Sequence, residues 1–355
     1  MNTIEYVKQE REHPIDCHNE VDALVLSQSV YFTFEHLVSQ LELAPIYLSD
    51  LNIELVSNPT NNPIVENHLI LLRAMKHSPH FRNLKVLDFE SHFSVEEELQ
   101  FAAITYLINE QNLFIVFRGT DFSTIGWKED FNMTFSKDVP AQVLAVEYIN
   151  RVMSLFDYPT YIGGHSKGGN LSVYGSSFCD KDYQLRIVKV YNFDGPGFRS
   201  NVIESEEYLT ILHKVVKYIP RSSVVGLFLS SQEITKVVES TNFSILQHDA
   251  FSWKIEGNSF VYKEQPTNLS KHFSKTIKDW LEEIDDDKRK YLIDAVFSGL
   301  SALDITSFDD PSQFNFSTIS NALSEYNNAE PEFKEFLREI LWSFVKGMFD
   351  LRRIN

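Results

Sequence analysis

The sequence has 355 residues, 43% of them hydrophobic, with 28 Phe and 15 Tyr, so it can bury a large core and is too apolar to be intrinsically disordered. Its 50 acidic and 32 basic residues give a net charge of −18, which argues against binding to nucleic acid or to anionic membranes. Only two cysteines are present, the N-terminal residues lack the apolar core of a signal peptide, and no apolar run approaches the roughly 18 residues of a transmembrane span. We therefore expect a cytoplasmic protein without a transmembrane segment.

The first part of the chain predicts two helices followed by strands. Residues 1–14 are polar and predict a loose lead-in, after which apolar residues recur at helical spacing, with Asn19 or Asp22 as the start signal. A loop is expected over 57–63, where Pro and Asn cluster. In chain order we expect helices over 19–43 and 65–75 and strands over 84–89, 100–107 and 113–117, the last two forming a hairpin.

The remainder alternates between helical and strand patterns. We expect a helix over 139–156, strands over 187–193 and 214–219, a β-rich patch over 251–262, and helices from 268 onward and over 331–351. Such alternation predicts an α/β fold with a mainly parallel sheet and helices on both faces. Because the composition shifts near Pro266, we predict a core over 1–265 and a helical C-terminal extension or cap over 266–355.

The motif that organises the chain lies at residues 161–170, which read Tyr-Ile-Gly-Gly-His-Ser-Lys-Gly-Gly-Asn. It contains G-x-S-x-G, with Gly164, Ser166 and Gly168 at the fixed positions, between an apolar run and a helical pattern. A strand, a sharp turn and a helix in this order are typical of a nucleophile elbow, where the glycines avoid collisions with the strand and the helix. The alternative is a glycine-rich turn that Ser166 only caps.

Two backbone amides are candidates for an oxyanion hole, the site that stabilises a negatively charged intermediate. Residues 117–121, Phe-Arg-Gly-Thr-Asp, follow a strand directly, and a loop containing glycine can turn its N–H groups toward the next strand end. We predict Thr120 N–H and Lys167 N–H, the latter from the residue after the serine, as the two donors. The alternative is an Arg-Gly turn with Arg118 in a surface ion pair.

An acid and a base are predicted after the serine. Asp194 ends a later strand, where carboxylates lie beside the site crevice of an open α/β sheet, and a turn-forming aspartate is the alternative interpretation. His248 is the candidate base, with Asp249 as a rival carboxylate to orient its ring. The order Ser, Asp, His along the chain is the one expected of an α/β-hydrolase.

No metal or cofactor is predicted. The sequence has no His-Glu-x-x-His motif, no cysteine pair and no calcium-loop spacing, and its glycines form neither a phosphate-binding nor a dinucleotide-binding loop.

These motifs carry a resemblance to known proteins. Phe-Arg-Gly-Thr at 117–120 and Gly-Gly-His-Ser-Lys-Gly-Gly-Asn at 163–170 resemble the class 3 lipase pattern, an F-R-G-T strand end followed by G-H-S-x-G-G. More closely, the chain resembles a bacterial family of uncharacterised lipase-like α/β-hydrolases, a domain of unknown function, over about residues 16–255. The matching stretches are 19–26, 126–132, the elbow, 192–198, 219–226 and 247–249.

The resemblance implies an α/β-hydrolase fold with Ser166, Asp194 and His248 as the triad of an ester hydrolase. The chain departs from class 3 lipases in one respect, because their acid follows the later strand, where this sequence has Lys214. The other acidic candidates are Glu204, Glu206 and Glu207.

We therefore expect a serine hydrolase, lipase- or esterase-like, that opens a small-molecule or lipid ester through an acyl-enzyme. Residues 224–229, Val-Val-Gly-Leu-Phe-Leu, are predicted to form a wall of the acyl pocket or a lid, with a buried core segment as the alternative. Two other functions stay open: a non-catalytic binding protein with the hydrolase fold, and an acyltransferase that uses the same acyl-enzyme. The sequence makes no prediction of the oligomeric state.

Overall fold

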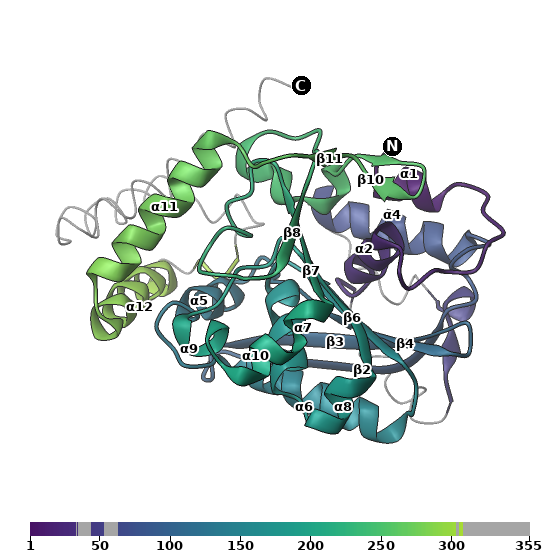
Figure 1. Ribbon diagram of the computed structural model, residues 1–355, viewed down its shortest axis with the longest axis horizontal. Helices are drawn as coiled ribbons and strands as arrows, with labels where there is room; N and C mark the ends of the chain where they lie inside the picture. The colour runs from purple at the N-terminus through teal and green to yellow at the C-terminus, as the bar shows by residue number, and fades with distance from the viewer. Residues whose placement is uncertain (33, 35–43, 53–62, 303–304, 308–355) are drawn as a thin grey trace.

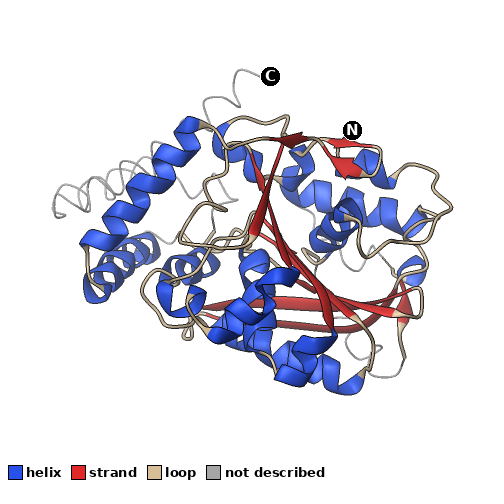
Figure 2. Ribbon diagram, viewed as in Figure 1, coloured by secondary structure: helices blue, strands red, loops and turns tan. Residues whose placement is uncertain are grey.

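The computed structural model describes residues 1–32, 34, 44–52, 63–302 and 305–307, and these residues are built around one mixed sheet (Figures 1 and 2). The strands of this sheet are, in spatial order, β1 (Ile46–Tyr47), β2 (Lys85–Ser94), β3 (Leu99–Ile108), β4 (Asn112–Phe117), β5 (Thr160–His165), β6 (Ile187–Phe193), β7 (Val215–Pro220), β8 (Ile234–Val238) and β11 (Tyr262–Lys263). The short strands β9 (Ile255–Glu256) and β10 (Ser259–Phe260) pair with each other outside it.

The centre of the sheet is parallel and its edges are antiparallel. Strands β4 to β8 run parallel to one another, whereas the pairs β1–β2, β2–β3, β3–β4 and β8–β11 are antiparallel. Every residue of β3 and β5 is buried, as expected for strands covered on both faces.

Helices cover both faces of the sheet, and each layer has its own apolar core. One face carries α1 (Thr3–Val7), α2 (Glu20–Ser29) and α4 (Pro63–His77). The other carries α6 (Pro140–Leu155), α7 (Lys167–Phe178), α8 (Lys181–Arg186), α9 (Ser200–Ile203) and α10 (Glu206–Ile211). This parallel sheet with crossover helices, and with a serine between β5 and α7, is the α/β-hydrolase fold, which confirms the predicted fold class.

Most predicted elements are present, with two differences. The hairpin is formed by β3 and β4, and Asn19 is the residue that caps α2. The lead-in prediction was wrong, because an Asn2–Glu5 capping box starts α1, and Tyr6 and Val7 are buried in the core. The sequence did not predict β8, whose first two residues are exposed. The expected loop over 57–63 lies mostly outside the described residues, and the helix over 331–351 lies entirely outside them.

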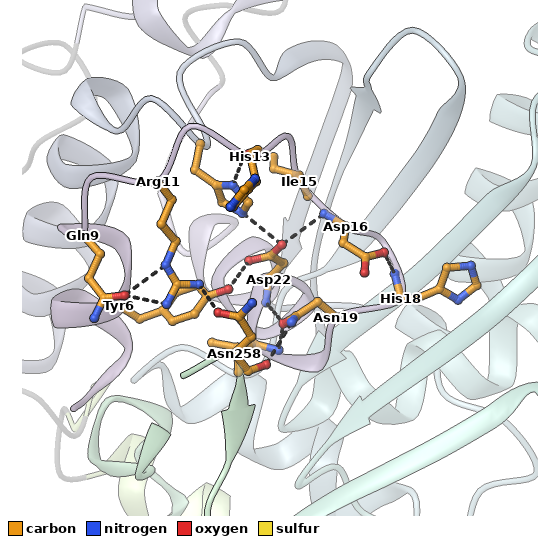
Figure 3. Close-up of polar contacts among 12 residues, drawn as sticks. Tyr6, Gln9, Arg11, His13, Ile15, Asp16, His18, Asn19, Asp22 and Asn258 are labelled. Atoms are coloured by element: carbon orange, nitrogen blue, oxygen red, sulfur yellow. Dashed lines mark hydrogen bonds and ion pairs between the residues drawn. The ribbon is translucent and has the colours of Figure 1, made fainter. Parts of the chain in front are cut away.

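One buried carboxylate, that of Asp22 on α2, helps to hold the N-terminal segment to the core (Figure 3). Its Oδ1 accepts a hydrogen bond of 2.7 Å from the Tyr6 hydroxyl, and its Oδ2 accepts one of 3.1 Å from Asp16 N–H. Its Oδ2 also lies 3.0 Å from His80 Nε2. Burial lowers the pKa of His80, but the hydrogen bond and the charge of Asp22 outweigh this effect and raise the pKa above its usual 6.5.

The C-terminal extension begins with two helices, α11 (Asn268–Glu283) and α12 (Asp286–Ala302) (Figure 1). The start of α11 lies on the loop after β7, where Thr267 N–H donates to Arg221 O at 2.8 Å. The helix α12 packs on α5 (Thr124–Asn132), with Lys128 Nζ lying 2.8 Å from Asp294 Oδ1. In the part of the chain that the structure describes, no helix is long and apolar enough to cross a membrane.

Candidate active site

Ser166 lies on the sharp turn between β5 and α7, as the motif predicts. Its backbone has φ +58° and ψ −132°, a sparsely populated region that costs a non-glycine residue about 1–3 kcal/mol. Its N–H donates to Phe193 O at 2.9 Å, which ties the turn to the end of β6. The side chain is half-buried at the start of α7, where the positive end of the helix dipole lies.

The two motif glycines are required by close backbone contacts. A Cβ on Gly164 would lie 2.3 Å from the carbonyl carbon of Gly168, and a Cβ on Gly168 would lie 2.1 Å from Phe117 O. No side chain fits at either distance. Glycine at 164 therefore lets the first turn of α7 pack on the end of β5, and glycine at 168 lets it pack on the end of β4.

Asp194 and His248 meet at the end of β6. Asp194 Oδ2 and His248 Nδ1 are 2.7 Å apart, and Asp194 Oδ1 accepts a hydrogen bond of 2.5 Å from the Ser223 hydroxyl. The Asp194 side chain has no exposed surface, whereas 26% of the His248 side chain is exposed, so the ring remains accessible to a ligand. Asp249 does not share this contact, since its carboxylate caps the next short helix by accepting from Phe251 N–H at 3.0 Å.

His165 links the serine to the histidine loop. Its Nε2 lies 2.8 Å from His248 O, and the two rings are 4.6 Å apart between centroids. On the other side, the Tyr31 hydroxyl lies 3.3 Å from His165 Nδ1. Burial, and next the charge of His248, hold the pKa of His165 well below its usual 6.5, so the ring is neutral and donates from Nε2 to the carbonyl. Among the described residues, Ser166 Oγ has no hydrogen bond to His248.

The loop after β4 lies against the serine. A Cβ on Gly119 would lie 3.1 Å from Ser166 Cβ, so Thr120 follows a point of direct contact with the elbow. The Thr120 hydroxyl donates a short hydrogen bond to Asp130 Oδ2 on α5. Burial raises the pKa of Asp130 to about 7, although the charge of Lys167 acts in the opposite direction.

Lys167 is the first residue of α7, so its N–H has no acceptor within the helix. Its side chain is fully buried, and its Nζ lies 2.8 Å from Glu129 Oε2 on α5. The same Nζ donates to Gln100 O at 2.6 Å and to Gln100 Oε1 at 2.8 Å. The ammonium thus has three acceptors in a site without water access.

The sequence did not predict two of the side-chain partners in this site, Ser223 and Glu129. Ser223, which donates to Asp194, follows β7 in the stretch 219–226, and Glu129 lies in the stretch 126–132. Both stretches were noted for their resemblance, but no local pattern connects Ser223 to Asp194 or Glu129 to Lys167. The segment 224–229, expected as a pocket wall or as core, is a half-buried loop beside Ser223.

The described residues contain no group of three or more His, Cys, Asp or Glu side chains that could hold a metal ion.

A profile of the Mbeg1-like family matches residues 75–298, well over half of the chain. The chain belongs to the Mbeg1-like family. This confirms the predicted membership of a lipase-like family, and we therefore interpret the site as that of a lipase-like hydrolase. No curated protein sequence matches the chain.

Similar solved structures include a Rhizomucor miehei lipase in its propeptide complex, with 14% identity and a TM-score of 0.37 over 51% of this chain and 71% of that one. M37 lipase has 12% identity and a TM-score of 0.38 over 66% of this chain and 82% of that one. A mutant of MDLA from Penicillium cyclopium has 13% identity and a TM-score of 0.36 over 70% of this chain and 90% of that one. Similarities of this size assign no function.

Proposed function

We propose that this protein is a serine hydrolase that cleaves carboxylic esters, with Ser166 as nucleophile, His248 as base and Asp194 as acid. The observation that carries the proposal is the 2.7 Å contact between Oδ2 of the buried Asp194 and His248 Nδ1, beside a serine on strained backbone. A turn-forming aspartate would not need to meet a histidine from a distant loop. The family membership supports the same class of chemistry.

In this mechanism Ser166 Oγ attacks the ester carbonyl while His248 Nε2 takes its proton. Asp194 Oδ2 accepts from His248 Nδ1–H, which fixes the tautomer that leaves Nε2 free as a base, and stabilises the imidazolium that forms. His248 then protonates the leaving alcohol, and a water activated by the same ring releases the acid from the acyl-enzyme. Ser166 Oγ makes no hydrogen bond to His248 among the described residues, and such contacts often tighten when substrate binds.

The N–H groups of Thr120 and Lys167 would stabilise the oxyanion. The loop of Thr120 touches Ser166 through Gly119, and Lys167 N–H is unused by α7. We propose a lipid or small-molecule ester as substrate, with the half-buried apolar loop 224–229 as a wall for the acyl group, and a cytoplasmic location. The division into a core over 1–265 and an extension over 266–355 is likewise a proposal.

Labelling with a fluorophosphonate probe tests this function. The wild-type protein should become labelled at Ser166, and Ser166→Ala should lose the label together with roughly 10⁶-fold in kcat. Ser172→Ala is the matched control, because that hydroxyl lies on the same helix and donates to Gly168 O at 2.7 Å. Folded wild-type protein that takes no label would leave a non-catalytic binding protein, and ester products formed with added alcohols would identify an acyltransferase.

A further inference from the structure

Two neighbouring acidic residues on α5 contact the side chains of the two residues whose N–H groups are the proposed oxyanion donors, and these two residues follow different strands. Glu129 contacts the side chain of Lys167, and Asp130 contacts the side chain of Thr120. Successive residues of an α-helix point about 100° apart, because the helix has 3.6 residues per turn. One short helix can therefore hold the elbow with one side chain and the loop after β4 with the next.

The contact to the elbow is the more strongly built of the two. Both side chains of the Lys167–Glu129 ion pair are fully buried. Glu129 Oε2 also accepts from Gln100 N–H at 3.1 Å, and Glu129 Oε1 accepts from Ala141 N–H at 2.8 Å. The Glu129 carboxylate thus connects the elbow to the start of β3 and to the start of α6.

A buried ion pair of this kind contributes little net stability to the fold. Removing two charges from water costs several kcal/mol per ion, and well-packed apolar replacements of buried ion pairs are often neutral or stabilising. The pair does fix a position. Three acceptors from two elements hold the Lys167 ammonium in place, and the lysine side chain in turn restrains the first residue of α7. The backbone N–H of that residue is the proposed oxyanion donor.

We propose that Glu129 and Lys167 are positioning residues that fix Lys167 N–H at hydrogen-bonding distance from the oxyanion, while α5 sets its separation from Thr120 N–H. The inference rests on the proposed ester hydrolysis and goes beyond it by giving the Lys167 side chain, which touches no substrate, a role in kcat.

The test is a double variant, Glu129→Leu with Lys167→Met, which removes both charges and keeps the volume. The melting temperature should fall only moderately, because no charge is left unpaired although Gln100 N–H and Ala141 N–H lose their buried acceptor. The value of kcat should fall about 10²-fold with KM within about twofold, which is the loss of one oxyanion donor. The affinity for a boronic acid that forms a tetrahedral adduct on Ser166 should fall by a similar factor.

Lys128→Met is the matched control. Lys128 precedes Glu129 on α5 and also pairs with carboxylates, Glu98 at 2.6 Å and Asp294 at 2.8 Å, but it has no contact with the elbow. This variant should keep the wild-type kcat. If the double variant does not fold, Glu129→Asp, which keeps the charge but shortens the side chain by one methylene, is measured by the same criteria and should lose about tenfold in kcat.

A double variant with wild-type kcat would overturn the inference, and so would a loss of kcat without a loss of affinity for the boronic acid. These results differ from a failure of the proposed function. In that case wild-type protein takes no fluorophosphonate label, and both proposals fall together. Wild-type protein that is labelled, with a double variant that is labelled at the same rate, removes the positioning role alone.

Discussion

At the scale of single residues, the decisive side chain is Asp194, because each of its oxygens has its own donor. Oδ2 meets the ring of His248 and Oδ1 meets the hydroxyl of Ser223, so the carboxylate is held in one orientation although it is fully buried. Its backbone lies in the left-handed region at φ +52°, and its N–H donates to Tyr218 O at 2.7 Å. Aspartate tolerates this conformation better than most residues, which explains how it can end the strand and still point at the histidine.

Substitution of the two rival carboxylates separates their roles. We expect Asp194→Asn to lower kcat about 10⁴-fold with little change in KM, because an amide can favour the wrong tautomer of His248. Asp249→Asn should stay within a few-fold of wild type, since Asp249 only caps a short helix. Steady-state kinetics on a chromogenic ester measure both. A large loss in Asp249→Asn and a small one in Asp194→Asn would mean that the acid has been assigned to the wrong residue.

At the scale of elements, the sequence predicts what is decided over short distances. The elbow could be found because its glycines fall in a fixed local motif, with Gly164 and Gly168 within five residues, although Gly168 is required by a contact with Phe117 O of the neighbouring strand. The hairpin of β3 and β4 has the same origin in a local apolar pattern. The candidate acid and base were predicted by their places at element ends, and the structure brings Asp194 and His248 into contact.

The remaining features depend on contacts that are remote in sequence. Glu129 lies 38 residues from Lys167, and Ser223 lies 29 residues from Asp194, so no periodicity reveals either pair. The strand β8 was missed because its first two residues are exposed, which weakens its apolar signal. The helix α1 was missed because Tyr6 and Val7 lie in a polar stretch without an apolar pattern. These two residues are buried only by packing on distant parts of the chain.

The attachment of this N-terminal segment gives a prediction at the same scale. Asp22→Ala should destabilise the protein by roughly 2–4 kcal/mol, because Tyr6 OH, Asp16 N–H and His80 Nε2 lose a buried acceptor together. Urea denaturation measures the loss, and limited proteolysis should cut the N-terminal segment faster.

Asp16→Ala is the matched control for this substitution. Its side chain is exposed and accepts only from His18 N–H at 2.9 Å, so we expect a change within about 0.5 kcal/mol. Equal stability of Asp22→Ala and wild type would show that the segment is held by its apolar contacts rather than by the carboxylate.

At the scale of the whole molecule, the C-terminal helices connect to both sides of the proposed site. On one side Ser274 Oγ of α11 donates to Leu227 O at 2.7 Å, in the loop that also carries Ser223. On the other side Arg289 Nη1 of α12 donates to Thr134 O at 2.9 Å, just beyond α5. The loop that carries Ser223, the hydrogen-bond donor to Asp194, and the end of α5 are therefore both in contact with the same pair of helices.

Histidines buried as neutral rings make the stability of the whole protein depend on pH. Burial lowers the pKa of His68 on α4 from 6.5 to about 4, and it lowers the pKa of His165 as well. Below pH 6.5 the unfolded chain therefore binds protons that the folded chain refuses, so the free energy of unfolding falls as the pH falls. For His68 the loss between pH 7.5 and pH 4 is on the order of 3 kcal/mol.

Replacement of His68 tests this share of the pH dependence. Urea denaturation of His68→Gln should give a smaller loss of stability between pH 7.5 and pH 5 than wild type, even though the variant is less stable at pH 7.5 because it loses the ring contacts with Tyr31 and Phe251. The exposed His77 at the end of the same helix is the matched control, and His77→Gln should lose as much as wild type. If His68→Gln also loses as much as wild type, burial of His68 does not set the acid limit, and His165 beside the elbow, whose pKa is also lowered by burial, becomes the next residue to replace.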